Sequence, residues 1–129
     1  MKKLALLLII LPFIFSSCKK EYIAVPVANN SQTILFDVSS SSWDTFDNGV
    51  TYSVPLNDPE ITDYFEANGH ITIYISYGNG IYEQIPEVYN DVAYSFTSGR
   101  GNVTVYAQDL TKAGMPSPNN ATIKVVLTD

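Results

Sequence analysis

The chain has 129 residues and carries 13 acidic against 7 basic side chains, so its formal net charge at neutral pH is −6. A surface this acidic repels phosphate backbones, which argues against nucleic acid as a partner. The chain has a single cysteine, so an internal disulfide framework is excluded as well.

The first residues form an export signal. Two lysines follow Met1, and the apolar run at residues 4–15 is shorter than the roughly 20 residues that span a bilayer. Two serines then precede Cys18. This arrangement predicts a secretory signal peptide at residues 1–17 and not a transmembrane helix. Its removal leaves 112 residues, the size of one domain that buries a core without disulfides.

The residues Phe15, Ser16, Ser17 and Cys18 resemble the lipobox of bacterial lipoproteins. The resemblance implies that the Cys18 thiol carries diacylglycerol, that the chain is cut before Cys18 and that the new amine is acylated. Burial of acyl chains contributes about 0.8 kcal/mol per CH₂, enough to hold the protein on the outer membrane. We expect residues 18–31 to be a tether. The domain is expected on either the periplasmic or the outer side of that membrane. The alternative is an ordinary signal peptide whose cleavage site happens to include a cysteine.

Residues 32–129 show the period-two alternation of apolar and polar residues that predicts β-strands separated by turns. Strands are expected at residues 33–38, 50–56, 70–77, 81–85, 92–97, 102–108 and 121–128. The Gly78-Asn79-Gly80 sequence predicts a tight hairpin turn between the third and the fourth of them. Each strand has one apolar face, as in antiparallel sheets with one side in water.

Residues 58–68 break this alternation, because Ile61, Tyr64 and Phe65 recur at helical spacing. Residues with the preferences of helix ends flank this segment: Asn57 or Asp58 as the N-cap, Pro59 in the first turn and Gly69 at the stop. We therefore expect one short helix packed across an end of the sheets.

About seven short strands and one crossover helix predict an all-β domain at residues 32–129, an immunoglobulin-like two-sheet antiparallel β-sandwich. A small closed β-barrel is the alternative. The lipobox, Trp43 and the segments PEIT (59–62), NGHITIYIS (68–76) and NGIYEQIP (79–86) together resemble small uncharacterised lipoproteins of Bacteroidota. That resemblance implies the fold and an envelope location, and it brings no catalytic residue or cofactor.

The side chains that support catalysis or metal binding are few. His70 is the only histidine, and its outward phase at the start of a strand predicts an exposed residue without a metal or catalytic role. The acids fall into three groups: Asp44 and Asp47; Asp58, Glu60 and Asp63; Glu83, Glu87 and Asp91. Turn and helix-end electrostatics explain the first two groups. Calcium binding is the functional alternative, although the spacing of Asp44 and Asp47 does not match a calcium loop.

Three tyrosines are the most suggestive residues for ligand binding. Tyr74, Tyr82 and Tyr106 are out of phase with the inward residues of their strands, so they form an exposed aromatic strip if those strands are neighbours. Sugars and protein partners bind to such strips. The alternative is that the rings are cross-strand pairs that stabilise a sheet without any ligand.

These observations predict a lipid-anchored accessory or interaction module of the cell envelope without catalytic activity. The hairpin at residues 74–82 and its neighbouring loops are the expected contact surface for an envelope protein or a glycan. A carbohydrate-binding module that uses the three tyrosines for polysaccharide capture is the first alternative. A small hydrolase is the second, and it requires a concave pocket that holds two acids across a substrate.

Overall fold

The computed structural model describes residues 31–129, so the predicted signal peptide and Cys18 lie outside the described residues. The strands in chain order are β1 (Gln32–Val38), β2 (Asp44–Thr45), β3 (Thr51–Asn57), β4 (His70–Ser76), β5 (Glu83–Ile85), β6 (Glu87–Tyr89), β7 (Val92–Gly99), β8 (Asn102–Asp109) and β9 (Ala121–Thr128). A 3₁₀ turn at Ser40–Ser42 follows β1, and the helix α1 (Asp63–Asn68) lies between β3 and β4.

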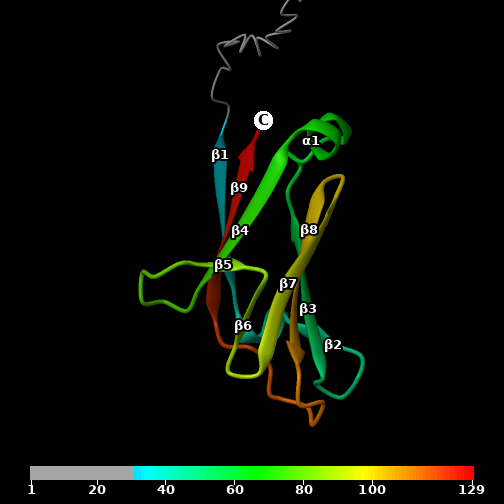
Figure 1. Ribbon diagram of the computed structural model, residues 1–129, viewed down its shortest axis with the longest axis vertical. Helices are drawn as coiled ribbons and strands as arrows, with labels where there is room; N and C mark the ends of the chain where they lie inside the picture. The colour runs from blue at the N-terminus through cyan, green and yellow to red at the C-terminus, as the bar shows by residue number, and fades with distance from the viewer. Residues whose placement is uncertain (1–30) are drawn as a thin grey trace, which may run out of the picture.

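The strands form two sheets that pack face to face (Figure 1). One has the strand order β1-β9-β4-β5 and the other β2-β3-β8-β7-β6, and every pairing is antiparallel. The predicted two-sheet antiparallel β-sandwich is therefore confirmed. The alternative of a closed barrel is wrong, because the two sheets do not share a strand pair.

The chain changes sheets between β1 and β2, β3 and β4, β5 and β6, and β8 and β9. The β3–β4 crossing carries α1 and lies at the end of the sandwich where β1 begins (Figure 1). The β8–β9 crossing is the long loop at the opposite end (Figure 1). We call these the helix end and the loop end.

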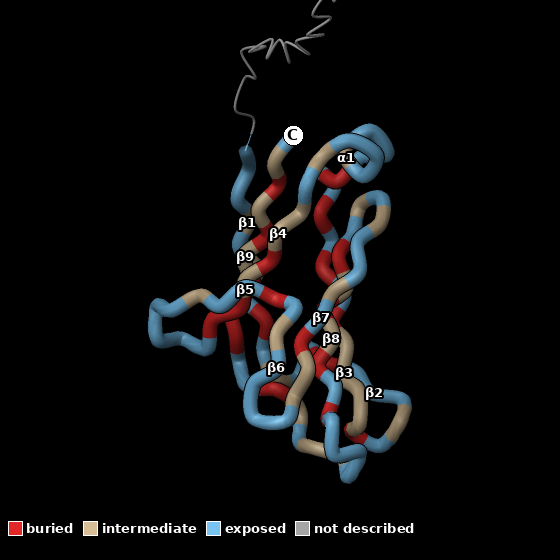
Figure 2. Tube along the Cα trace, viewed as in Figure 1, coloured by how far each residue is buried: buried red, intermediate tan, exposed pale blue. Residues whose placement is uncertain are grey.

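The core lies between the sheets and is made by the inward-facing residues of the long strands (Figure 2). In β9 every second residue from Ala121 to Leu127 is buried, and in β4 Ile73 and Ile75 are buried beside them. The opposite sheet contributes Val103 and Val105 of β8 with no exposed surface. The period-two pattern predicted these faces correctly, because side chains of successive strand residues point to opposite sides of a sheet.

The helix begins later than the sequence predicts. Thr62 is its N-cap, and its hydroxyl accepts the backbone N–H of Phe65 at 3.2 Å. Asp58, a predicted cap, is buried in the preceding turn, where its carboxylate accepts the N–H of Glu60 at 3.2 Å. Ile61 is fully buried just before the helix, as expected for a docking residue, whereas Tyr64 is 71% exposed and does not belong to that face.

The turn between β4 and β5 is also wider than predicted. Gly78 and Gly80 both have the positive φ expected of turn glycines, with values of 88° and 73°. However, β5 pairs with β4 only over Glu83–Ile85, so the connection is an open loop and not a tight hairpin. Within residues 31–129, no helix is long and apolar enough to cross a membrane.

Candidate functional site

Tyr74 and Tyr82, two of the three predicted ligand-binding tyrosines, lie on the outer face of the β4-containing sheet. They flank Lys124 of β9, the register partner of Tyr74. The Lys124 Nζ lies 4.6 Å from the ring centroid of Tyr74 and 4.1 Å from that of Tyr82. A cation over an aromatic face is attracted by the ring quadrupole. One face of each ring is therefore covered by a side chain of the same domain.

Tyr106, the third of these tyrosines, lies on the other sheet. It is in β8, between Ser53 of β3 and Ser95 of β7, and its hydroxyl is 3.4 Å from the Thr97 Oγ1. Because β4 and β8 belong to different sheets, Tyr106 cannot join Tyr74 and Tyr82. The expectation of one continuous strip of three rings is wrong, and any ligand-binding role of the separate residues stays a prediction.

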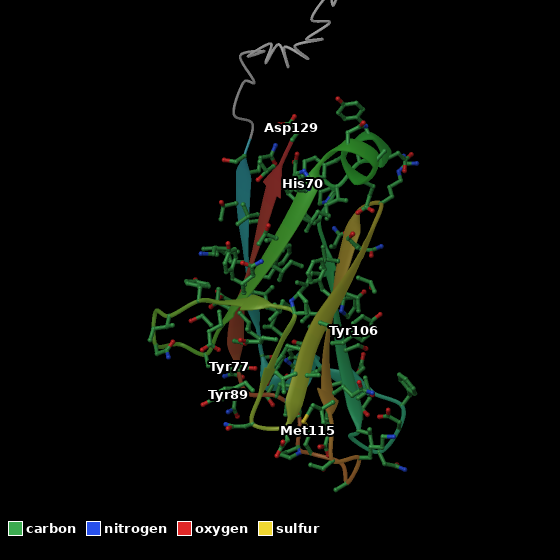
Figure 3. The ribbon with its side chains drawn as sticks, in the orientation of Figure 1. His70, Tyr77, Tyr89, Tyr106, Met115 and Asp129 are labelled. Atoms are coloured by element: carbon green, nitrogen blue, oxygen red, sulfur yellow. The ribbon has the colours of Figure 1, made fainter. Side chains whose placement is uncertain are left out.

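His70 is exposed at the start of β4, as predicted. It lies near the helix end, far from the tyrosines of the loop end (Figure 3).

One acid from each of the first two acidic groups has a local structural role. Asp47 accepts the backbone N–H of Thr51 at 2.7 Å in the β2–β3 turn, and Asp63 forms an exposed ion pair with Arg100 at 3.0 Å. Among the described residues, no group of three His, Cys, Asp or Glu side chains is suited to a metal ion.

A pocket of about 530 Å³ opens at the loop end, between the two sheets. Small-molecule sites in proteins occupy roughly 300–1,000 Å³. Its walls come from β4 and the β4–β5 loop, from the β6–β7 turn with β7, and from the β8–β9 loop. The aromatic and apolar side chains that line it include Tyr77, Ile81, Tyr89, Tyr94 and Met115. Figure 3 shows Tyr77, Tyr89 and Met115 in the same part of the molecule.

Several of these apolar side chains are also accessible to solvent. Ile81 is 61% exposed and Tyr89 is 56% exposed, and the neighbouring Val88 is 64% exposed. Tyr77, which directly follows β4, is 37% exposed. Exposed apolar residues are ordinary when they are scattered, but a group of them beside a concave surface indicates a binding site.

Asp109 at the end of β8 holds the wall formed by the β8–β9 loop. Its carboxylate is buried and accepts the Thr111 hydroxyl at 2.7 Å, the Thr111 N–H at 2.9 Å and the Gly114 N–H at 2.9 Å. The hydroxyl of Thr111 is the main cause that lowers the pKa of Asp109 below its usual value, and the backbone N–H groups add to it. The loop therefore has a defined shape although it contains no strand or helix.

The same loop is attached to the rest of the loop end at three further points. The Met115 N–H donates to the Gly49 carbonyl at 2.9 Å, and the Met115 carbonyl accepts the Tyr52 hydroxyl at 3.1 Å. The Ser117 hydroxyl donates to the Ser40 carbonyl at 2.6 Å. Met115 and Ser117 both line the pocket, so these bonds fix the position of the wall.

One acid of the third group lines the pocket. It is Glu83 of β5, and Glu87 follows on β6 without lining the pocket. Burial raises the pKa of Glu87, and the Glu83 charge and a side-chain hydrogen bond with Glu83 raise it further. Burial is also the main cause that raises the pKa of the Tyr77 phenol, and the neighbouring Tyr94 raises it further. The rings of Tyr77 and Tyr94 meet edge to face, with centroids 6.3 Å apart.

Comparison of the chain with protein-family models, with curated proteins and with solved structures finds no match.

The predicted contact surface overlaps the lining of this pocket. The hairpin at residues 74–82 was expected to be a contact surface, and its loop contributes Tyr77 and Ile81 to the pocket. Sequence reasoning missed Tyr89, Tyr94 and Met115. Tyr94 is buried and lines the pocket. The loop composition around Met115, rich in proline and asparagine, was the available signal for a surface wall.

Proposed function

We propose that this protein is a lipid-anchored recognition module of the bacterial envelope that binds a ligand in the loop-end pocket without changing it chemically. The observation that carries the proposal is the aromatic pocket of about 530 Å³ between three chain segments with defined positions. Binding residues are often found on loops that a rigid scaffold holds in place. The resemblance of the signal region to a lipobox supports Cys18 as the attachment point to the outer membrane.

The position of the pocket suits an anchored receptor. Gln32 begins β1 near the helix end, whereas the pocket opens at the loop end (Figure 1). A tether that leads into β1 therefore attaches the domain at the end remote from the pocket. The ligand would approach from the side that faces away from the anchoring membrane.

A saccharide is the ligand class that the pocket lining favours. Flat tyrosine faces pack against the apolar face of a sugar ring, as they do against other amphipathic surfaces. The amide groups of Asn79, Asn90 and Asn119 and the carboxylate of Glu83 provide hydrogen-bonding partners for hydroxyl groups. This proposal keeps carbohydrate capture but places it in the pocket and not on a strip formed by Tyr74, Tyr82 and Tyr106.

Binding is favoured over hydrolysis because of the arrangement of the acids. A glycosidase places two carboxyl groups on opposite sides of the scissile bond, roughly 5–9.5 Å apart. Here Glu83 lines the pocket, whereas Glu87 is not among its lining residues. We expect the protein to leave a bound oligosaccharide intact over prolonged incubation, as measured by chromatography of the sugar.

The pocket is tested with a matched pair of tyrosines. Affinity electrophoresis of the full chain in detergent, through gels that contain single soluble polysaccharides, measures retention. We expect Tyr89→Ala to weaken retention at least about ten-fold, which corresponds to about 1.4 kcal/mol. Tyr64→Ala, which changes another exposed tyrosine on α1, should leave retention unchanged. Equal retention of both variants, or no retention of the wild type by any polysaccharide, would contradict the proposal.

The anchor is tested separately. Cys18→Ala should move the protein from the membrane fraction to the soluble fraction of cells, because no acyl chain can then be attached. Protease treatment of intact cells, with lysed cells as the control for a resistant fold, determines the side of the outer membrane. A membrane-bound Cys18→Ala variant would contradict lipidation at this residue.

A further inference from the structure

The charge on the lining of the pocket is acidic. Of the described residues that line it, Glu83 is acidic and none is basic. Asp91 lies in the β6–β7 turn next to the lining residue Asn90, and Glu87 lies on β6. Of the basic residues that the structure describes, Arg100 pairs with Asp63, Lys124 lies between two tyrosines, and Lys112 is in the β8–β9 loop but does not line the pocket. The charged side chain in the described lining is therefore negative.

Glu83 and Glu87 are unfavourable neighbours in the chain when both are ionised, because like charges repel. Burial is the main cause that raises the pKa of Glu87, and the charge of Glu83 raises it further. A cation next to Glu83 would offset this repulsion, whereas a neutral hydroxyl group would not. An anionic sugar, such as a uronic acid, would increase it.

The tyrosines of the pocket favour the same kind of ligand. Ammonium groups bind to the faces of aromatic rings, and a desolvated position strengthens this attraction. The domain already contains an example, since the Lys124 ammonium lies 4.6 Å and 4.1 Å from the centroids of Tyr74 and Tyr82. Tyr89, at 56% exposure, leaves its ring accessible to a ligand beside Glu83.

We propose that the loop-end pocket selects saccharides that bear a protonated amino group, with the ammonium next to Glu83 and the sugar ring against Tyr89. This inference rests on the proposed function, because it specifies the ligand of the same pocket. It adds charge selection by Glu83 to the stacking that any saccharide would share.

Two probes that differ in charge and in the N-acetyl groups test the inference. Calorimetry of the full chain in detergent compares a glucosamine tetramer, at a pH where its amines are protonated, with the fully N-acetylated tetramer. We expect the amine form to bind at least about ten-fold more tightly. Glu83→Gln should remove this preference and leave the affinity for the acetylated form unchanged. Glu60→Gln, which changes an exposed acid at the helix end, should keep the preference, and Tyr89→Ala should weaken binding of both probes.

The outcomes separate this inference from the proposed function. Equal affinities for the two tetramers, or binding of the acetylated form alone, would overturn the charge selection and leave the saccharide pocket intact. A preference that survives Glu83→Gln and Tyr89→Ala would assign the attraction to the acidic surface as a whole, which also overturns it. No binding of either tetramer overturns it too, and retention on the polysaccharide gels then decides whether the pocket binds sugars.

Discussion

At the helix end the space between the sheets is filled by Ile61, whereas at the loop end the corresponding space is a pocket. Ile61 has no exposed surface, and its carbonyl accepts the Gly101 N–H at 2.8 Å. The Asp58 N–H donates in turn to the Gly101 carbonyl at 3.0 Å, so the β3–α1 segment and the β7–β8 turn close this end together.

The loop end has the same two sheets, where Trp43 of the β1–β2 crossing is buried in the core and Met115 packs against the core and lines the pocket. Its long loop is held at the edge by Asp109 and by bonds to Gly49 and Tyr52, so it forms a wall and not a cover. The comparison shows that strand pairing does not determine whether an end of a sandwich is closed. At the helix end a crossing segment brings the fully buried Ile61 between the sheets, whereas at the loop end the β8–β9 crossing is bonded to Gly49 and Tyr52 and lines the pocket.

The largest expected effect comes from a matched pair of isoleucines. Ile61→Ala removes a fully buried side chain and should lower the free energy of unfolding by about 2–5 kcal/mol. Ile81→Ala, at 61% exposure in the loop end, should change it by less than about 0.5 kcal/mol but weaken saccharide binding. Urea denaturation measures both. Similar losses of stability in the two variants would contradict the distinction between a filled and an open end.

A comparable or smaller effect is expected from two glycines with positive φ. Gly101 has φ 75° and open space where the methyl group of an alanine would lie, so Gly101→Ala should cost about 1–2 kcal/mol for the left-handed backbone alone. Gly114 has φ 88°, and a Cβ there would lie 2.7 Å from the Asn48 carbonyl oxygen. Gly114→Ala should therefore cost about 1–3 kcal/mol more than Gly101→Ala.

Thermal or urea unfolding of the two glycine variants provides the comparison. The Gly114→Ala variant should in addition lose saccharide affinity, because the displaced loop carries Met115 and other residues of the pocket wall. If Gly101→Ala were the more damaging substitution, the close contact between the β8–β9 loop and the β2–β3 turn would not determine the shape of the loop end.

The smallest effects are expected from pH, and the two ends should respond in opposite directions. Burial raises the pKa of Asp58 above 3.8, so its contribution to stability is present below 3.8 and is lost as the pH rises through the folded-state pKa. The Thr111 hydroxyl lowers the pKa of Asp109 below 3.8. Its contribution is present above 3.8 and is lost as the pH falls through the folded-state pKa.

The corresponding variants make this measurable. From about pH 3 to about pH 7, Asp58→Asn should become more stable relative to the wild type, and Asp109→Asn should become less stable. Urea denaturation midpoints across this range report both differences. A shift of the same sign for the two variants would contradict the opposite environments of these carboxylates. The unpartnered Oδ2 of Asp58, which is buried, is the structural reason for expecting a gain at neutral pH.

The helix and the tyrosines show where sequence reasoning stops being sufficient. Asn57, Asp58 and Pro59 all carry the preferences of a helix start, yet α1 begins at Asp63. The reason is tertiary, because the Asp58 N–H pairs with Gly101, a residue that is distant in sequence. A cap preference is local, and it cannot anticipate that the same backbone is needed to close the helix end.

The sequence by itself determined the long strands, their buried faces and the class of fold, but not the short strands β2 and β6. Alternation has a period of two along a single strand, so Ile73 and Ile75 or Val103 and Val105 could be assigned to the core without knowledge of their neighbours. Only the tertiary structure decided which strands are adjacent, and hence that Tyr74 and Tyr106 lie on different sheets. It also decided that three separate loops surround one pocket, because strand pairing and loop attachment depend on contacts between residues that are remote in the sequence.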